Sequence, residues 1–487
     1  KITAHYLYQV LTKAGSPETL RDRLDLPEGK AVSAAAWQAI IDAAEDHNRP
    51  GEFTTFIAYE WTSMPDSDNL HRNVVYRSDQ VPERPFSSLD SDNPEVLWNT
   101  LDQQRAAGMD NMAIPHNGNV SNGRMYEAQR FNGEALDKDY ALQRNRNEPI
   151  SEILQVKGAS ETHPMLSPDD GFAGFEIYDQ RMRKEGGMSE PKGSYARDAL
   201  RTGMELQNRE SFNPFEFGFI GSSDSHNGSS SVEEDNYHGK LPLLDGSAGL
   251  RQGKTLLLPK DINRGARWSA QGLAGVWAEE NTRESLFDAM RRRETFATSG
   301  PRIRLRFFAG WDFPQGILQR KDYLSLAYRQ GIPMGSRLSA NENRQQSAGG
   351  PAFLLSAVKD PQGANLDRIQ IIKLWIDKNG QSHERVYDVV ASDNRRPDSD
   401  SHKVEPLPDT VDAKTATYTQ QYGASQLSTL WRDPDFNAEQ QAAYYARVLQ
   451  IPTPRYSTFD AKTLGIEPPE PISIQERAIS SAIWYRP

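Results

Sequence analysis

Two kinds of hydrophobic pattern alternate along the first 300 residues. Short apolar runs of strand length are separated by stretches in which apolar residues recur every three or four positions, as on one face of a helix. The apolar runs are FTTFIAYE (53–60), RNVVYR (72–77), NMAIPH (111–116), GFAGFEIYD (171–179) and FGFIGSSDSH (217–226). The helical stretches are residues 31–47, 93–107, 127–145, 195–207 and 281–293. This alternation predicts an α/β fold with helices packed on a parallel or mixed sheet.

After Pro301 the pattern changes to runs that read as strands. They are IRLRFFAGW (303–311), DYLSLAY (322–328), AFLLSAV (352–358), RIQIIKLWID (368–377) and RVYDVVA (385–391). Lys378-Asn379-Gly380, between the last two runs, predicts a hairpin turn. One further helix is expected over residues 438–450, followed by an extended tail. We therefore expect a first domain over 1–300 and an antiparallel, β-rich region over 301–487 packed on it.

The composition excludes several classes of site. The chain has no cysteine, so disulfides, thiolate zinc sites, iron–sulfur clusters and cysteine nucleophiles are excluded. The net charge of -11 argues against a nucleic-acid partner. No apolar run reaches the roughly 20 residues of a membrane span. Glycine-rich nucleotide-binding motifs and a G-x-S-x-G serine motif are also absent.

Acidic and imidazole side chains gather next to the predicted strands. Glu60 ends the first apolar run, His71 precedes the second, and His116 ends the third. Asp224 and His226 end the fifth run as an Asp-x-His pair, whose two side chains point the same way on extended chain. Ligands bind at strand ends in barrels and open α/β folds, so these five residues are candidates for a shared divalent metal site.

Each of these residues has an ordinary structural explanation when it is taken alone. An isolated Asp-x-His pair is more often a cap or a surface hydrogen bond, His116 a hydrogen-bonded histidine, and Glu60 a solvent carboxylate. The metal hypothesis depends on the whole set, because several strand ends carry the same class of ligand. Zn, Mn or Fe would suit imidazole and carboxylate ligands.

A second polar cluster follows the apolar residues 153–156. It contains Lys157, Glu161 and His163, which are candidates for orienting a substrate or transferring a proton. A polar loop with a capping serine explains the same segment about equally well. Asn117, beside His116, is a candidate for hydrogen bonding to substrate, and an Asx turn is its structural alternative.

With these residues in place, the chain resembles an uncharacterised family of metal-dependent hydrolases. That family lies in the polymerase-and-histidinol-phosphatase (PHP) superfamily and is related to bacterial carbaryl hydrolases. The resemblance covers most of the chain and is carried by FTTFIAYEWTSMPDSDNLHRNVVYR (53–77), AIPHNGNVSNG (113–123), QVKGASETHPMLSP (155–168), GFEIYD (174–179), GFIGSSDSHNG (218–228), RRRETFATSGPRIRLRFF (291–308), GIPMG (331–335) and RVLQIPTPRYSTFDAK (447–462).

The resemblance implies a distorted barrel of seven strands and helices that binds two or more metal ions. It assigns the ligand role to Glu60, His71, His116, Asp224 and His226, and places the Lys157–His163 segment facing substrate. The superfamily opens with an H-x-H motif and an Asp-His pair, neither of which is found before Glu60. From this departure we expect that the sequence lacks an N-terminal segment; a degenerate, non-catalytic relative is the alternative.

The expected activity is hydrolysis of a small-molecule ester by metal-activated water. Phosphoesters are favoured, because metal ions and cationic side chains suit an anionic substrate. Carboxyl or carbamate esters are the first alternative, and a metal-stabilised binding protein is the second. The absence of cysteine fits a periplasmic or secreted protein slightly better than a cytoplasmic one. The oligomeric state is left open.

Overall fold

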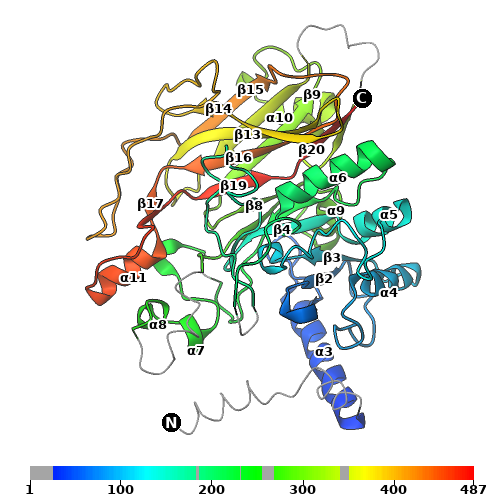
Figure 1. Cartoon of the computed structure of the whole chain (residues 1–487). Coiled ribbons are helices and arrows are strands. Elements are labelled where there is room, and N and C mark those ends of the chain that lie inside the picture. Colours follow the sequence, from blue (N-terminus) through cyan, green and yellow to red (C-terminus); the bar gives the residue numbers. More distant parts are fainter. Residues whose placement is uncertain (1–25, 183–185, 231, 255–267, 341–349) are drawn as a thin grey trace.

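The chain forms a mixed α/β structure made of several sheets (Figure 1). The computed structural model describes residues 26–182, 186–230, 232–254, 268–340 and 350–487. The coarse α/β prediction agrees with this structure. No sheet closes into a barrel within these ranges, because the sheets that contain the first six strands are not hydrogen-bonded to each other. The seven-stranded PHP-type barrel is therefore not seen in the described part of the chain.

Two three-stranded sheets form the part of the fold that positions the candidate site. The first has the order β1 (Ala58–Trp61), β2 (Arg72–Tyr76) and β3 (Asn111–Pro115), and all of its pairs are antiparallel. The second has the order β5 (Gly158–Ala159), β4 (Ile150–Gln155) and β6 (Gly218–Gly221), with β4 parallel to β6.

The largest sheet combines strands from both halves of the sequence. Its main path is β11 (Arg337–Ser339), β20 (Ile483–Arg486), β16 (Ala442–Gln450), β19 (Arg477–Ser480), β8 (Thr295–Thr298) and β7 (Leu273–Val276). The hairpin β13 (Leu366–Ile376) and β14 (Ser382–Ala391) joins it through pairing of β13 with β16. The sheet is thus continuous across the domain boundary expected at residue 300.

The remaining strands form two smaller antiparallel sheets. One has the order β10 (Ile332–Pro333), β9 (Arg304–Gly310), β12 (Ala352–Val358) and β15 (Gln426–Arg432). The other pairs β17 (Thr453–Pro454) with β18 (Ser473–Ile474). Figure 1 shows the strands of residues 300–487 gathered on one side of the molecule, away from helix α3.

The α-helices are α3 (Pro27–His47), α4 (Pro94–Ala106), α5 (Lys138–Asn147), α6 (Ala196–Glu210), α7 (Pro242–Asp245), α8 (Ala248–Arg251), α9 (Arg283–Arg291), α10 (Tyr323–Gln330) and α11 (Tyr456–Leu464). The short 3-10 helices are η1 (Pro65–Ser67), η2 (Gly118–Val120), η3 (Glu234–Asn236) and η5 (Ile317–Gln319). Helix α4 begins where its sequence predicts: Asn93 caps the backbone N–H of Glu95, and Pro94 takes the first position, where no N–H partner is needed.

Four predicted features are wrong. The tail after residue 450, expected to be extended, contains helix α11 and strands β17 to β20. Residues 323–328 form part of helix α10, and residues 171–179 form turns and irregular chain with Glu176 in a left-handed conformation. Residues 442–450 form strand β16 and not the expected helix. Every residue of β16 is buried, because it lies in the middle of the large sheet, so it shows no alternation of apolar and polar side chains.

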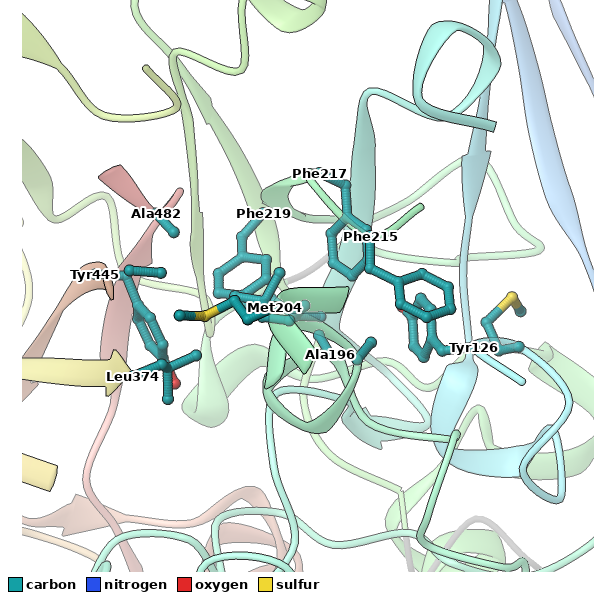
Figure 2. Close-up of a cluster of buried hydrophobic side chains, with 14 of the residues drawn as sticks. Tyr126, Ala196, Met204, Phe215, Phe217, Phe219, Leu374, Tyr445 and Ala482 are labelled. Carbon is teal, nitrogen blue, oxygen red and sulfur yellow. The ribbon is translucent and has the colours of Figure 1, made fainter. Parts of the chain in front are cut away.

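The hydrophobic core crosses the two halves of the chain. Figure 2 shows aromatic residues of β6 and its preceding loop, among them Phe217 and Phe219, packed near Met204 of α6. Leu374 of β13 and Tyr445 of β16 belong to the same buried cluster. Burial of such large side chains stabilises the fold by about 1.5–3 kcal/mol each. The cluster therefore holds the site-bearing strands against the large sheet.

A membrane-spanning helix was not expected, and the part of the chain that the structure describes contains none of sufficient length and apolar character.

Candidate metal centre

Glu60, His71 and His116 lie together at one end of the three strands of the β1–β2–β3 sheet. The strands are antiparallel, so the end of β1, the start of β2 and the end of β3 lie side by side; Trp61 pairs with Arg72, and Arg72 with Pro115. Glu60 Oε1 lies 2.7 Å from Nδ1 of His71 and 3.2 Å from Nε2 of His116. The sheet register therefore explains why residues far apart in sequence converge.

The chemistry of these three side chains suits a metal ion. One potential ligand atom from each of them lies within 4.8 Å of the other two. The second ring nitrogen of each histidine, Nε2 of His71 and Nδ1 of His116, is buried without a hydrogen-bond partner. Imidazole and carboxylate are common ligands of Zn, Mn and Fe. The cluster could therefore hold a divalent metal ion.

The ionisation of the cluster favours metal binding. Burial disfavours the charge of Glu60, but hydrogen bonds from His116 and His71 outweigh it and lower the pKa of Glu60. Burial also lowers the pKa of His71 to about 4. A charged carboxylate next to a neutral imidazole is the form that coordinates a metal at neutral pH. The side chain of Glu60 keeps 32% of its surface exposed, so solvent can reach the cluster.

Asp224 lies outside this triad and is bonded to two lysines. Its Oδ2 contacts Nζ of Lys157 and lies 2.7 Å from Nζ of Lys240. Burial opposes the charge of Asp224, but Lys157, Lys240 and His116 together lower its pKa. Asp224 is therefore held in its charged form by the two ammonium groups.

His226 lies further toward the surface. Its side chain is 43% exposed, and its Nδ1 is 3.0 Å from the carbonyl oxygen of Asp224. The structure thus brings three of the five expected metal ligands together and places the other two in a neighbouring cluster. A ligand role for Asp224 and His226 stays a prediction.

Asn117, beside His116, has a strained backbone and a side-chain amide without hydrogen bonds. Its backbone is left-handed (φ 57°), and its fully buried side chain has neither amide atom hydrogen-bonded. Asp224 is also left-handed, at φ 51°. Non-glycine residues in this conformation are uncommon and concentrate at functional sites. The side chain of Asn117 makes no Asx turn, which leaves it able to bond a ligand.

Glu161 and His163 have different surroundings from the triad. The carboxylate of Glu161 accepts hydrogen bonds from Arg197 at 2.6 Å and from the hydroxyl of Tyr445 at 2.7 Å, inside a buried ion network. His163 is buried, its Nδ1 accepts from the backbone N–H of Met165, and burial lowers its pKa. The bonds of Glu161 favour a structural role; the expected catalytic roles of Lys157, Glu161 and His163 stay predictions.

Two charged residues near the cluster were missed in the sequence. Glu152 is buried in β4, and its Oε2 accepts a hydrogen bond from the backbone N–H of Asn117 at 3.3 Å. A charged residue inside the apolar run of β4 was a signal that could have identified it. Lys240 lies in the segment HGKLPL, which carries no recognisable motif.

Glu152 should make the stability of the protein depend on pH in a way that can be tested. Burial raises its pKa to about 8, and the charge of Asp224 adds to this increase. The folded state therefore keeps a proton that the unfolded chain has lost, so the contribution of Glu152 to stability falls as pH rises from about 4.5 to about 8. After metal removal, Glu152→Gln should stabilise the protein more at about pH 8.5 than at about pH 5. Urea unfolding of both proteins measures this; an equal effect at both pH values would contradict it.

Comparison with known proteins gives one finding about the family. Residues 2–487 match the DUF3604 family, described as a protein of unknown function. Neither the curated proteins nor the solved structures contain a significant match. The match covers nearly the whole sequence, including the strands that carry Glu60, His71 and His116. The chain is a member of the DUF3604 family.

Proposed function

We propose that the protein is a metal-dependent hydrolase of ester bonds, with phosphoesters as its favoured substrates. The observation that carries this proposal is the convergence of Glu60, His71 and His116, with two imidazole nitrogens buried and unpartnered. A bound divalent ion lowers the pKa of water from about 15.7 toward about 7 and so supplies a nucleophile at neutral pH. The partial exposure of Glu60 fits a catalytic centre, which keeps one side open, better than a closed structural one.

Different residues would bind the metal ions and the substrate. Glu60, His71 and His116 would hold one ion, and Asp224 with His226 would contribute to a second. Mn, Zn or Fe fits these ligands. Asn117 would donate a hydrogen bond from its free amide to the substrate. Burial of Asn117 and Glu152 around the cluster restricts bulk water on that side.

Charge supports the preference for phosphoesters. Lys157 and Lys240 both form ion pairs with Asp224, so two ammonium groups share one carboxylate next to the triad. A surplus positive charge stabilises an anionic substrate and the charge that develops during its hydrolysis. Carboxyl or carbamate esters are the second candidate class, because the same triad would activate water for them.

The sequence resemblance to the PHP superfamily agrees with this proposal. It would extend the observed sheets to a distorted seven-stranded barrel, with an added β-rich region after residue 300. A periplasmic or secreted location, and a small-molecule substrate, belong to the same proposal. The location follows from the absence of cysteine, and the other points follow from the matching segments and the triad.

The direct test is metal removal and replacement. Protein stripped with a chelator is assayed on p-nitrophenyl phosphate and p-nitrophenyl acetate, before and after addition of Mn, Zn or Fe. We expect activity to return with metal, and to be higher on the phosphate ester. Higher activity on acetate would favour the second substrate class. Absence of restored activity on both would contradict a hydrolase.

The same experiment separates the non-catalytic alternative. A metal that only stabilises a binding protein would raise the melting temperature without producing turnover. Melting curves measured on the stripped and reloaded samples therefore accompany the assays. A rise in melting temperature with no activity on any ester would favour the binding protein.

A further inference from the structure

A separate acidic pocket lies where loops of the two halves of the chain meet. It has a volume of about 160 Å³ and includes residues of η3, β17 and α11 together with the loops after β8 and β12. Figure 1 shows α11 beside the short helices α7 and α8, away from the triad-bearing strands β2 and β3. None of the residues expected at the metal centre lines this pocket.

Most of the charged side chains that line the pocket are acidic. Arg455 and Arg477 lie outside the lining and interact with Glu234 and Glu476, respectively. Arg302 is the single cation among the described residues that line it, and its side chain is 66% exposed. The acidic residues of the lining are Glu233, Glu234, Asp235, Asp360 and Glu476. Arg302 lies 3.9 Å from Glu233 at the surface, so it does not neutralise the deeper carboxyl groups.

Glu476 is buried and Glu234 is half-buried in this lining. Burial raises the pKa of Glu234 to about 8. Burial also raises the pKa of Glu476 well above its usual range, and the charge of Glu234 adds to that increase. Glu476 is 3% exposed and accepts a hydrogen bond from Ser299. A cation bound beside Glu234 and Glu476 would favour the charged form of both carboxyl groups.

Two buried polar atoms in the lining have no partner. Oε1 of Glu234 accepts no hydrogen bond, although its Oε2 accepts one from the backbone N–H of Tyr456. Nε2 of Gln450 is also unpartnered, and Gln450 is only 1% exposed. Buried polar atoms are nearly always bonded in native proteins, so this pair points to a missing ligand. Gln450 lies on β16, so this observation is independent of the acidic cluster on η3.

The lining also has an apolar and aromatic surface, beside the polar side chains of Gln362 and Thr453. Val232, Pro454, Phe459 and Tyr418 provide this surface. A cavity of roughly 150 Å³ is large enough for a benzene-sized group. The pocket therefore combines room for a small apolar body with carboxyl groups for a positive charge.

We propose that this pocket binds a small organic cation, an ammonium or amidinium group on a short apolar body. The charged group lies between Glu234 and Glu476, the amide of Gln450 bonds its polar edge, and the apolar body contacts Phe459 and Tyr418. This site is distinct from the metal centre and does not depend on the proposed hydrolase activity.

Benzamidine is the probe, because it joins an amidinium group to a phenyl ring. Titration calorimetry of the full chain, kept in chelator, compares benzamidine with benzoate and benzyl alcohol. We expect saturable binding of benzamidine at one site and much weaker binding of the anion and the neutral alcohol. Equal binding of all three compounds, or no saturable binding of benzamidine, would overturn the proposal.

Two variants locate the binding site. Glu234→Gln keeps an oxygen for the N–H of Tyr456 but removes the carboxyl group that would lose its proton when a cation binds, and should weaken benzamidine binding at least about tenfold. Glu467→Gln, at an exposed side chain outside the pocket, is the matched control and should change the affinity less than about threefold. Equal affinities of both variants and wild type would refute the site. If Glu234→Gln does not fold, Glu476→Gln makes the same test.

Discussion

Replacing His116 with glutamine is expected to release the bound metal ion and to lower esterase activity about 1,000-fold, equal to about 4 kcal/mol. His116 is buried, and glutamine keeps most of its volume while removing the imidazole. Without this ligand Glu60 and His71 alone would hold the ion, and two protein ligands are fewer than metal centres normally use. Elemental analysis of the purified variant and assays on p-nitrophenyl phosphate measure the two effects.

A control histidine separates loss of a ligand from a general loss of imidazole. His383, in β14, is 43% exposed and stacks on Trp375, so His383→Gln should leave metal content and activity unchanged. His226→Gln can be measured alongside: loss of part of the metal would assign His226 to a second ion, and full retention would exclude it as a ligand. Full metal content and activity in His116→Gln would refute the proposed centre.

Replacing Arg197 with methionine is expected to lower the free energy of unfolding by about 3–5 kcal/mol. Arg197 is completely buried in α6, and its guanidinium bonds Glu161 at 2.6 Å and Asp170 at 2.9 Å. Methionine fills similar space but leaves Glu161 without its nearest cation. An uncompensated carboxylate in the interior is strongly destabilising, because burial disfavours its charge. Urea unfolding followed by circular dichroism measures the change.

Arg209, on the same helix, provides the control. Its side chain is 64% exposed and pairs with neighbouring Glu210, so Arg209→Met should change stability by less than about 0.5 kcal/mol. The double variant Arg197→Met/Glu161→Gln should recover part of the lost stability, because it removes the uncompensated charge. If Arg197→Met were as stable as Arg209→Met, the ion network would not hold α6 to the large sheet.

Hydrophobic patterns predicted the bounds of several elements closely. Helix α4 and strand β2 lie close to their expected bounds, and the hairpin between β13 and β14 turns at residues 378–380 as expected. The method failed for β16, because a strand buried on both faces shows no alternation. It also failed for α10, a short helix of eight residues whose pattern suits either structure.

The sequence predicted the part of the candidate site that depends on a single sheet. Glu60, His71 and His116 flank strands of one antiparallel sheet, and the sheet register alone brings them together. Asp224 follows β6, which belongs to another sheet, so its position relative to Glu60, His71 and His116 depends on how the two sheets pack. Lys240 comes from a loop far along the chain, and no local pattern marks a residue whose role depends on tertiary packing.

The position of β19 in the large sheet affects how the protein is made. β19 lies between β8 and β16, and it follows both of them in the sequence. A nascent chain that has left the ribosome as far as β16 therefore exposes two unpaired strand edges. Such edges recruit other chains readily and are aggregation-prone until the missing strand inserts. The large sheet can be completed only after synthesis has passed residue 486, because β20 also belongs to it.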